Sequence, residues 1–373
     1  MGALNVAMIG YGFMGKAHSN AYAQVGHFFP HVPKVRRRVV CGRSRAGLEA
    51  LADAWGWEEV ETDWRRVIDR PDIDAVDICT PNYLHAEMAV AAARAGKMVL
   101  CEKPLANSLE EARAMVSAAS RVPTFVWFNY RRVPAVELAR RLIEEGRLGR
   151  IYQYRAKYLQ QWGPDPSRPR NWKMSRSTAG SGVNGDLNSH LLDTAMMLLG
   201  PIRELSATFE TILPEKPDPD RPGETYAIDI DDVVLVQARF RSGVLGTFEA
   251  TRFATGYQND NSFVVHGEKG MVEFHFEHMN RLEYADAGGD PDLRGRRRVL
   301  APSPGPPADP YYWKPGHPIG YEHTFTSSLA DFLAGLESGE PARPTFEDGL
   351  RVQRVLAAIE ASAARRSWVG TGL

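Results

Sequence analysis

The chain has 373 residues, 43% hydrophobic and 24% charged, and its 45 basic and 46 acidic side chains give a formal net charge of -1. Such a chain is long enough for two domains with separate cores, and its charge gives no general attraction to nucleic acid or an anionic membrane. We therefore interpret the basic runs VRRR near Arg36 and RGRRR ending at Arg298 as solvated loop surface, and expect neither nucleic acid nor a membrane as a partner.

Short apolar runs alternate with helical patterns in the first third of the chain. The runs that predict strands are NVAMIG, RRVVCG, DAVDICTP, KMVLCEKP and TFVWF. Between them, KAHSNAYAQVG, AGLEALADAWG, HAEMAVAAARAG and SLEEARAMVSAAS carry apolar residues at helical spacing. Because strand, helix and strand follow one another, residues 1–127 are predicted to form an α/β domain of the Rossmann type, with a doubly wound parallel sheet.

The pattern changes after about Phe128. A helix is predicted around residues 135–145, a long strand in RIYQYRAKYLQQW, and a second helix over residues 186–199. The runs DVVLVQARF, VLGTFEATRF, SFVVHG and MVEFHF then predict neighbouring strands. Such a succession indicates an α+β domain over residues 128–373, with a large, mainly antiparallel open sheet half covered by helices.

The cysteines and the N-terminal sequence indicate the cellular compartment of the protein. Cys41, Cys79 and Cys101 each lie in or beside a predicted buried strand, which excludes a disulfide framework and is typical of a reducing compartment. No apolar segment has the length of a membrane span, and the N-terminus lacks the pattern of a signal peptide. We therefore expect a cytoplasmic protein.

The stretch VAMIGYGFMGKAHSNAYAQVG, residues 6–26, joins the first strand to the first helix through a glycine-rich turn. Such a turn places backbone N–H groups and the positive end of a helix around a space that a pyrophosphate enters only where side chains are absent. An ordinary glycine-rich turn is the alternative, but its place at the head of a βαβ series favours dinucleotide binding. The candidate residues are Gly10, Gly12, Phe13, Met14 and Gly15.

The second strand ends in VVCGRSRAG and lacks the acidic residue that usually binds the adenine ribose of NAD. Arg43 and Ser44 stand there instead, and both are donors that suit the 2′-phosphate of NADP. Arg43 could equally lie over the adenine ring. NAD and NADP therefore both remain candidate cofactors.

The stretch ICTPNYLHAE ends another strand at the carboxyl edge, where doubly wound sheets bind ligands. Further cofactor-binding candidates here are Thr80, Pro81, Asn82 and His85. Asn82 is equally interpreted as a cap of the following helix, and His85 as helix surface or local structure.

The stretch VLCEKPLANS places Glu102 and Lys103 just past a buried strand, where the nicotinamide is expected, and both are cofactor-binding candidates. An ammonium group there can donate to a substrate oxygen and stabilise alkoxide character as hydride leaves. Pro104 holds Lys103 out of the helical region. The alternative is a surface lysine before a helix.

The stretch GSGVNGDLNSHLLDTAMMLLG places Asp186 and His190 four residues apart on a predicted helix, and so on one face. The histidine could take a hydroxyl proton while the carboxylate or Lys103 sets its protonation and orientation. The same spacing would also suit helix capping or a metal. No third ligand is evident, so no metal is expected.

In combination, Gly10-x-Gly12-x-x-Gly15, EKP at 102–104 and Asp186-x-x-x-His190 resemble the Gfo/Idh/MocA family of nicotinamide-dependent sugar and cyclitol oxidoreductases over nearly the whole chain. The stretches FNYRRVPAV, YLQQW and AGSG are most similar to levoglucosan-dehydrogenase-like and inositol-dehydrogenase-like members. The resemblance implies oxidation of a ring secondary alcohol, with Lys103 and His190 as the catalytic pair and Asp186 assisting. It also implies homodimer or homotetramer contacts through the C-terminal sheet.

A sugar, anhydrosugar, cyclitol or glycoside needs several donors and acceptors for its hydroxyl groups. Candidates from the predicted second domain are Asn129, Tyr130, Arg131, Tyr158, Gln160, Trp162, Trp172 and Asn188. Each has a structural alternative, but the polar and aromatic set fits a carbohydrate better than a hydrophobic ligand. Two other functions stay open: a glycoside-cleaving enzyme that oxidises its substrate transiently with tightly held NAD, and a non-catalytic dinucleotide-binding sensor.

Overall fold

The computed structural model describes residues 2–165, 171–218, 221–288, 290–301, 312–314 and 316–373, and it divides into two compact units. The first unit runs to Arg132 and also includes Gly320–Gln353, and the second comprises Val133–Ile319 and Arg354–Leu373. The sequence placed its boundary at residue 127. The segment from Gly320 joins the first unit because α9 (Tyr321–Ser338) packs along α1 (Phe13–Phe28).

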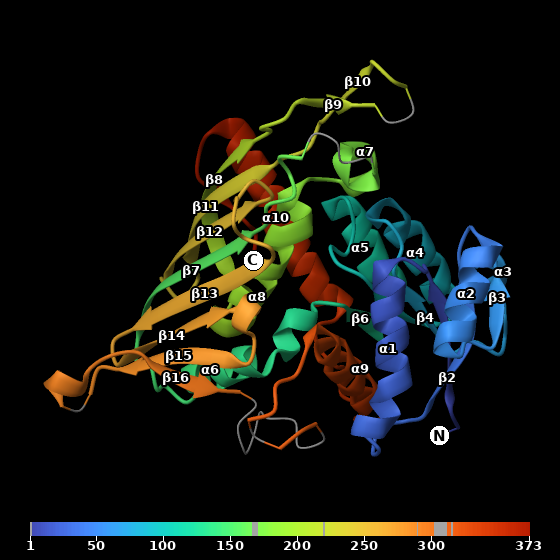
Figure 1. Ribbon diagram of the computed structural model, residues 1–373, viewed down its shortest axis with the longest axis horizontal. Helices are drawn as coiled ribbons and strands as arrows, with labels where there is room; N and C mark the ends of the chain where they lie inside the picture. The colour runs from blue at the N-terminus through green and yellow to red at the C-terminus, as the bar shows by residue number, and fades with distance from the viewer. Residues whose placement is uncertain (1, 166–170, 219–220, 289, 302–311, 315) are drawn as a thin grey trace. The chain divides into compact units, whose positions relative to one another are not determined.

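The first unit contains a six-stranded sheet in the order β3-β2-β1-β4-β5-β6, with every pair of strands parallel (Figure 1). Its strands are β1 Leu4–Ile9, β2 Val35–Cys41, β3 Glu59–Glu61, β4 Ala75–Ile78, β5 Met98–Cys101 and β6 Thr124–Val126. This confirms the predicted Rossmann sheet. The strand order reverses between β1 and β4, so ligands are expected at the carboxyl ends of these two strands.

Helices connect these strands and cover the sheet. They are α2 Arg45–Trp55, α3 Trp64–Ile68, α4 His85–Arg94 and α5 Leu109–Ala118, with short turns η1 Asn82–Leu84 and η2 Asn129–Arg132. The long helix α10, Phe346–Arg365, begins in the first unit and ends in the second. No helix was predicted over the residues of α9 or α10.

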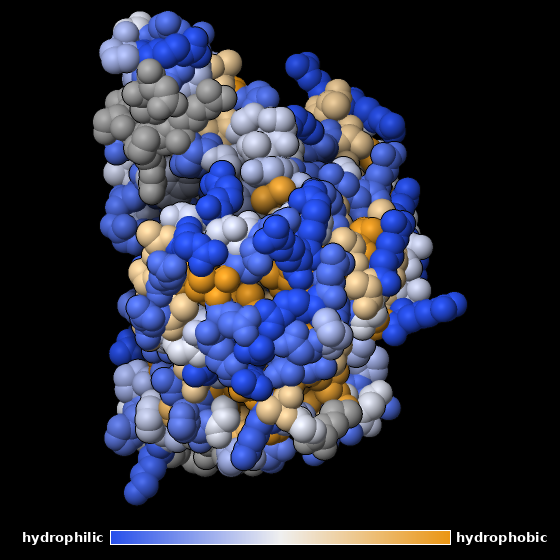
Figure 2. All heavy atoms as spheres, turned by 90° about the vertical axis from the view of Figure 1, so that its right-hand side faces the viewer, coloured by the Kyte–Doolittle hydropathy of each residue, from blue (hydrophilic) through white to orange (hydrophobic). Residues whose placement is uncertain are grey.

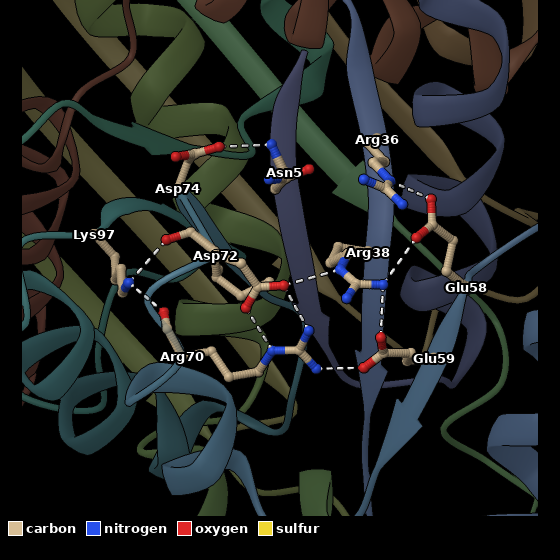
Figure 3. A network of polar contacts seen from close by, with 10 residues as sticks. Asn5, Arg36, Arg38, Glu58, Glu59, Arg70, Asp72, Asp74 and Lys97 are labelled. Atoms are coloured by element: carbon tan, nitrogen blue, oxygen red, sulfur yellow. Dashed lines mark hydrogen bonds and ion pairs between the residues drawn. The ribbon is translucent and has the colours of Figure 1, made fainter. Parts of the chain in front are cut away.

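The arginine run at the start of β2 forms an ion-pair network, so its interpretation as loop surface is wrong (Figure 3). Arg38 Nη1 lies 2.9 Å from Glu58 Oε2, and Arg38 Nε lies 2.9 Å from Asp72 Oδ2. Arg70 also pairs with Asp72, at 2.7 Å. The network lies toward the amino ends of the strands, away from the carboxyl edge, and its acids neutralise the basic run.

The second unit contains a nine-stranded sheet in the order β16-β15-β14-β13-β7-β12-β11-β8-β17. Among its strand pairs in the described part of the chain, β7 with β12 is parallel and the others are antiparallel, so the predicted, mainly antiparallel sheet is confirmed. The strands are β7 Ile151–Leu159, β8 Ile202–Glu210, β11 Val233–Phe240, β12 Leu245–Thr251, β13 Asp260–Gly267, β14 Gly270–His275, β15 Arg281–Asp286, β16 Arg297–Leu300 and β17 Val369–Gly370. Arg297 and Arg298 thus begin a strand.

One face of this sheet is covered and the other is open. The covering elements are α6 Pro134–Glu144, the π-helix η4 Asn184–Asn188, α8 Ser189–Leu199 and the second part of α10 (Figure 1). The remaining elements are α7 Arg176–Ala179, η3 Trp172–Met174, η5 Phe276–His278, η6 Pro291–Leu293 and the hairpin of β9 Glu215–Pro217 with β10 Thr225–Ala227. Alternation along β11 buries Val234 and Val236 but leaves Leu235 exposed on the open face.

The face of the molecule seen in Figure 2 carries mainly hydrophilic residues, with hydrophobic residues in small groups. None of the helices in the described ranges combines the length and the apolar character that crossing a bilayer requires.

Candidate active site

Each glycine of the motif has a different structural role: Gly10 and Gly12 precede α1, and Gly15 lies in its first turn. Gly10 has φ +122°, and a Cβ there would lie 2.5 Å from the backbone oxygen of Cys79. A Cβ on Gly15 would lie 2.7 Å from the backbone oxygen of Gly10. At Gly12 nothing in the described part of the chain lies within 4 Å of an added Cβ, and Gly12 caps α1 without a side-chain hydrogen bond. The open space and the uncapped helix end fit a pyrophosphate.

The turn also carries an aromatic residue that the sequence analysis missed. A Cβ on Gly42 would overlap the ring of Tyr11, and one on Gly47 would lie 2.9 Å from Tyr11 Cε2. The ring therefore fills the space that an acidic side chain at the end of β2 would need. Arg43 is exposed, and the Ser44 hydroxyl caps α2 by accepting from Gly47 N at 3.3 Å.

His85 links two loops at the carboxyl edge of the sheet. Its side chain is buried, with Nδ1 3.1 Å from Pro104 O and Nε2 3.0 Å from Thr80 O. Burial lowers the pKa of His85, although these two carbonyl groups oppose the shift. The interpretation of His85 as helix surface is therefore wrong, while its role in local structure is clear.

Asn82 is buried in η1, and Leu84 occupies the N-cap of α4 without a side-chain hydrogen bond. Because η1 runs directly into α4, the interpretation of Asn82 as a cap of this helical segment stays a prediction. Cofactor binding by the residues of this loop stays a prediction.

Glu102 and Lys103 follow β5 as expected, and Glu102 is buried. Glu102 Oε1 lies 3.0 Å from His18 Nε2, and Glu102 Oε2 accepts a hydrogen bond from Lys103 N at 3.1 Å. Both carboxylate oxygens therefore contact groups of the chain itself. These contacts support a positioning role for Glu102, and its contact with a cofactor stays a prediction.

In the second unit, Asp186 lies between two cations that the sequence analysis missed. Lys173 Nζ lies 3.1 Å from both carboxylate oxygens of Asp186, and Arg252 Nη2 donates to Asp186 Oδ2 at 3.0 Å. The Arg252 side chain is buried, and its guanidinium lies 4.7 Å from the ring centre of Trp162. Arg252 is 66 residues from Asp186 along the chain, and Lys173 lies outside any recognised motif. No sequence pattern therefore linked either cation to Asp186.

The predicted continuous α-helix over residues 186–199 is interrupted: Asp186 lies in the π-helix η4 and His190 in α8. The carboxylate of Asp231 holds the start of η4 by accepting from Gly182 N at 2.7 Å and Asn184 N at 2.6 Å. Single π-turns inside helices are frequent at functional sites.

A chain of side-chain hydrogen bonds begins at Tyr158, next to the His190 ring. The Tyr158 ring lies 6.0 Å from that of His190, and Tyr158 OH donates to Asn259 Oδ1 at 2.9 Å. Gln160 Nε2 donates to the same oxygen at 2.8 Å, and Trp162 Nε1 donates to Gln160 Oε1 at 2.6 Å. The structure thus brings together four predicted residues, and adds Asn259.

The other candidates lie in different surroundings. Trp172 lies 5.6 Å from Lys173 Nζ, and Asn188 is buried, with its Nδ2 donating to Asn184 Oδ1 at 3.2 Å. Asn129, Tyr130 and Arg131 form part of η2 and belong to the first unit, not to the second domain as predicted.

Asn129 itself is buried, and its Nδ2 donates to Thr324 Oγ1 at 2.9 Å. No group of three or more His, Cys, Asp or Glu side chains within the described ranges is placed to hold a metal ion.

A Rossmann sheet with an open glycine turn, and a second unit that carries Asp186 and His190 beside polar and aromatic side chains, define a dinucleotide-binding oxidoreductase. Family models match both parts: "Oxidoreductase family, NAD-binding Rossmann fold" over residues 4–130, and "GFO/IDH/MocA C-terminal domain" over residues 136–273. The chain belongs to the Gfo/Idh/MocA family of oxidoreductases.

Similar proteins cover almost the whole chain. It is 43% identical to levoglucosan dehydrogenase of Pseudarthrobacter phenanthrenivorans over 98% of this chain and 97% of that protein. It is 28% identical to inositol 2-dehydrogenase of Rhizobium meliloti over 96% of each. A solved structure of levoglucosan dehydrogenase in complex with NADH and levoglucosan has a TM-score of 0.94 at 42% identity and covers 100% of both chains. An oxidoreductase domain protein from Kribbella flavida has a TM-score of 0.95 at 44% identity, with 100% of both chains covered.

Proposed function

We propose that the enzyme oxidises a ring secondary alcohol of a sugar-like polyol, with the anhydrosugar levoglucosan as the first candidate substrate. The observation that carries this proposal is the chain of hydrogen bonds from Tyr158 through Asn259 and Gln160 to Trp162, beside the His190 ring. Amide and phenol groups next to aromatic faces suit a ligand with many hydroxyls and an apolar ring face. The similarity to levoglucosan dehydrogenase over nearly the full length supports the same substrate class.

We propose NAD rather than NADP as the cofactor. The glycine turn would hold the pyrophosphate, and the nicotinamide, when bound, supplies a hydride acceptor. NADH is present in solved structures of levoglucosan dehydrogenase, which supports this choice. Arg43 is the residue that would favour NADP, so Arg43→Ala should lower kcat/KM with NADP by a larger factor than with NAD. A greater loss with NAD would contradict the proposal that Arg43 discriminates in this direction.

In the proposed mechanism, the reacting side chains are His190 and Lys103. His190 accepts the proton of the substrate hydroxyl, and the Lys103 ammonium donates a hydrogen bond to the same oxygen, which stabilises its developing negative charge. Asp186 is held as a carboxylate by Lys173 and Arg252, so it acts as an acceptor that orients its neighbours rather than as a proton donor. Ketone reduction uses the same groups in reverse.

The test is a screen of levoglucosan, inositols, simple pyranoses and glycosides with NAD and NADP, followed by absorbance of the reduced nicotinamide. The proposal expects steady NADH formation with levoglucosan or another ring polyol. Product release from a glycoside without net NADH would indicate transient oxidation instead. Cofactor binding without turnover of any of these compounds would indicate a sensor.

We also propose that two or more copies associate through the open face of the nine-stranded sheet. A hollow of about 650 Å³ lies on this face, lined among others by Arg155, Lys157, Leu235, Glu249 and Glu273. Side chains of both charges beside an exposed leucine suit pairing with a second copy. Light scattering after gel filtration should give a dimer or tetramer mass for the wild type and a smaller mass for Leu235→Glu. A wild-type monomer would contradict the proposal.

A cytoplasmic location is proposed from the cysteines. Cys41, Cys79 and Cys101 are free thiols, and burial raises the pKa of Cys41 to about 12. Cys41 and Cys101 are buried and Cys79 is partly buried, and free thiols of this kind are typical of a reducing compartment. Fractionation of cells that express the protein should recover it with cytoplasmic markers, and recovery with exported proteins would contradict the proposal.

A further inference from the structure

A buried cluster of charged side chains lies around His18, on the helix that follows the glycine turn. His18 Nδ1 lies 2.9 Å from Asp77 Oδ2, and His18 Nε2 lies 3.0 Å from Glu102 Oε1. Asp77 also accepts from Tyr22 OH at 3.0 Å and from Trp127 Nε1 at 2.9 Å. The side chains of His18 and Asp77 are completely buried, so the cluster is part of the interior of the first unit.

The geometry of the cluster favours protons on both nitrogens of the imidazole. Each ring nitrogen of His18 faces a carboxylate oxygen, and an ionised carboxylate only accepts hydrogen bonds. The indole ring of Trp127 lies 4.2 Å from the imidazole, and the ring of Phe325 lies 5.6 Å from it. A positive imidazolium between two carboxylates therefore satisfies both of its N–H groups within an otherwise aromatic environment.

The cluster continues to the backbone of the proposed catalytic lysine. Glu102 uses one carboxylate oxygen for His18 and the other for the backbone N–H of Lys103. His18 belongs to α1, whose first turn carries the glycine motif, and Asp77 belongs to β4. One imidazole thus connects the pyrophosphate-binding helix, a central strand and the segment that carries Lys103.

We propose that His18 is a positioning residue of the dehydrogenase reaction, which holds Lys103 in its working position through Glu102. This inference rests on the proposed function. His18 acts through Glu102 and does not touch substrate or cofactor, so its removal should affect turnover mainly through Lys103.

A purely structural role would give a different result. A buried charged cluster that only stabilised the fold would lower the stability of the unit, and the loss of His18 would affect turnover equally with or without Lys103. A positioning role predicts strong coupling between the two residues, because the contribution of His18 is lost when Lys103 is absent.

The first experiment is a double-mutant cycle on kcat with His18→Gln and Lys103→Ala. We expect His18→Gln to lower kcat by about tenfold or more while KM and the Kd for NADH stay within about threefold of wild type. In the Lys103→Ala background it should change kcat by less than about twofold. Equal losses in both backgrounds, or wild-type kcat in the single variant, would overturn the inference.

The matched control is His27→Gln. His27 lies on the same helix, in its last turn, and is exposed. We expect its kcat to equal that of wild type. A loss like that of His18→Gln would show a general effect of altering α1 and would overturn the inference.

A second readout needs neither cofactor nor turnover. Hydrogen exchange of the Lys103 amide, followed by mass spectrometry of a peptide that spans residues 99–106, should be faster in His18→Gln than in wild type and His27→Gln, because the acceptor oxygen of Glu102 is no longer fixed. Unchanged exchange would overturn the inference. If wild type turns over no polyol, the proposed function fails, and with it the role of His18 in turnover; turnover with unchanged exchange refutes the inference alone.

Should His18→Gln not fold, Glu102→Gln and Glu102→Ala test the same connection. Only glutamine keeps an oxygen for the Lys103 N–H, so we expect Glu102→Ala to lose more kcat than Glu102→Gln. Equal kcat values in the two variants would overturn the inference.

Discussion

The two units bury charge in opposite arrangements: in the first, His18 lies between two carboxylates, and in the second, Asp186 lies between two cations. The first arrangement is closed. His18 is completely buried, and its partners are held by indole, phenol and backbone donors. The second is partly open, since the Asp186 side chain is 17% exposed and that of Lys173 is 37% exposed.

This difference indicates which cluster holds other groups in place and which one can contact a ligand. A buried charge cluster whose hydrogen bonds are made inside the unit can hold neighbouring groups in position, but it does not bind a ligand itself. A partly exposed carboxylate held by two cations, with Trp162 under one of them, can still meet a polar ligand. The first cluster is therefore expected to act on the reaction indirectly, and the second to act at the substrate.

The largest effects are expected for the two side chains that are proposed to react. Lys103→Ala and His190→Ala should each lower kcat by about a hundredfold or more, because each removes a group that donates or accepts at the reacting oxygen. The Kd for NADH, measured by fluorescence, should change little. Lys97→Ala is the matched control: Lys97 precedes β5 as Lys103 follows it, and its Nζ donates to Arg70 O and Ile73 O. Wild-type kcat in either variant would remove that residue from the mechanism.

The glycine turn tests the same distinction within the first unit, between a residue that the fold needs and a residue proposed to contact the cofactor. Gly12→Ala places a methyl group in open space, so the fold should tolerate it while the Kd for NADH rises by roughly tenfold, as crowding at a packed site costs about 1–3 kcal/mol. Gly10→Ala should instead lower the unfolding temperature, because φ is +122° and the methyl group meets Cys79 O. Calorimetry and NADH titration of both variants would contradict this assignment if the two effects were exchanged.

The glycine turn, the segment of Lys103 and both sheets could be predicted from the sequence because each depends on local pattern. Gly10, Gly12 and Gly15 lie in one short stretch from the end of β1 to the first turn of α1, and strand periodicity marks β11 and β12. The elements α9 and α10 gave no such prediction, and their assignment to one unit or both depends on contacts between distant segments.

The supporting residues were missed for the same reason. His18 and Asp77 are 59 positions apart, and Arg252 and Asp186 are 66 apart, so no spacing rule connects them. The π-turn at Asp186 was also missed, because an α-helical pattern does not reveal one inserted residue. Sequence motifs thus indicated the groups proposed to react, whereas the groups that hold them became evident only in the fold.

The cations beside Asp186 should differ in importance because their burial differs. Arg252→Met removes a buried guanidinium that contacts both Asp186 and Trp162, and we expect kcat/KM to fall by about tenfold as both side chains shift. Lys173→Met removes a more exposed partner and should change kcat/KM by only a few-fold. Steady-state kinetics of the two variants measure this difference. Equal losses would show that the two cations act as one unit and would contradict a separate role for Arg252.

The pH dependence of stability tests the charge of His18 without any measurement of turnover. Burial alone would lower the pKa of His18, but Asp77 and Glu102 raise it from 6.5 to about 9. A raised pKa means that the native state binds the proton more tightly, so this stabilisation is complete below about pH 6.5 and is lost as the pH rises to about 9. Burial and Asp77 also raise the pKa of Tyr22, and burial raises that of Cys79 and Cys101, so these neighbours titrate above this range.

The measurement is urea unfolding between pH 6 and 9.5 in wild type and His18→Gln. In this range the wild type should lose on the order of 3 kcal/mol more stability than the variant, as an upper bound for a shift to about 9. The comparison between the two proteins cancels the contribution of His275 in the second unit, whose pKa is also raised, by Asp260 and Glu273. Burial lowers the pKa of His85 below 6.5. His85 therefore changes the stability only below pH 6.5, where the native state loses stability as the pH decreases. Parallel curves for the two proteins would mean that His18 is neutral in the native state, and the contrast between the two buried clusters would then no longer hold.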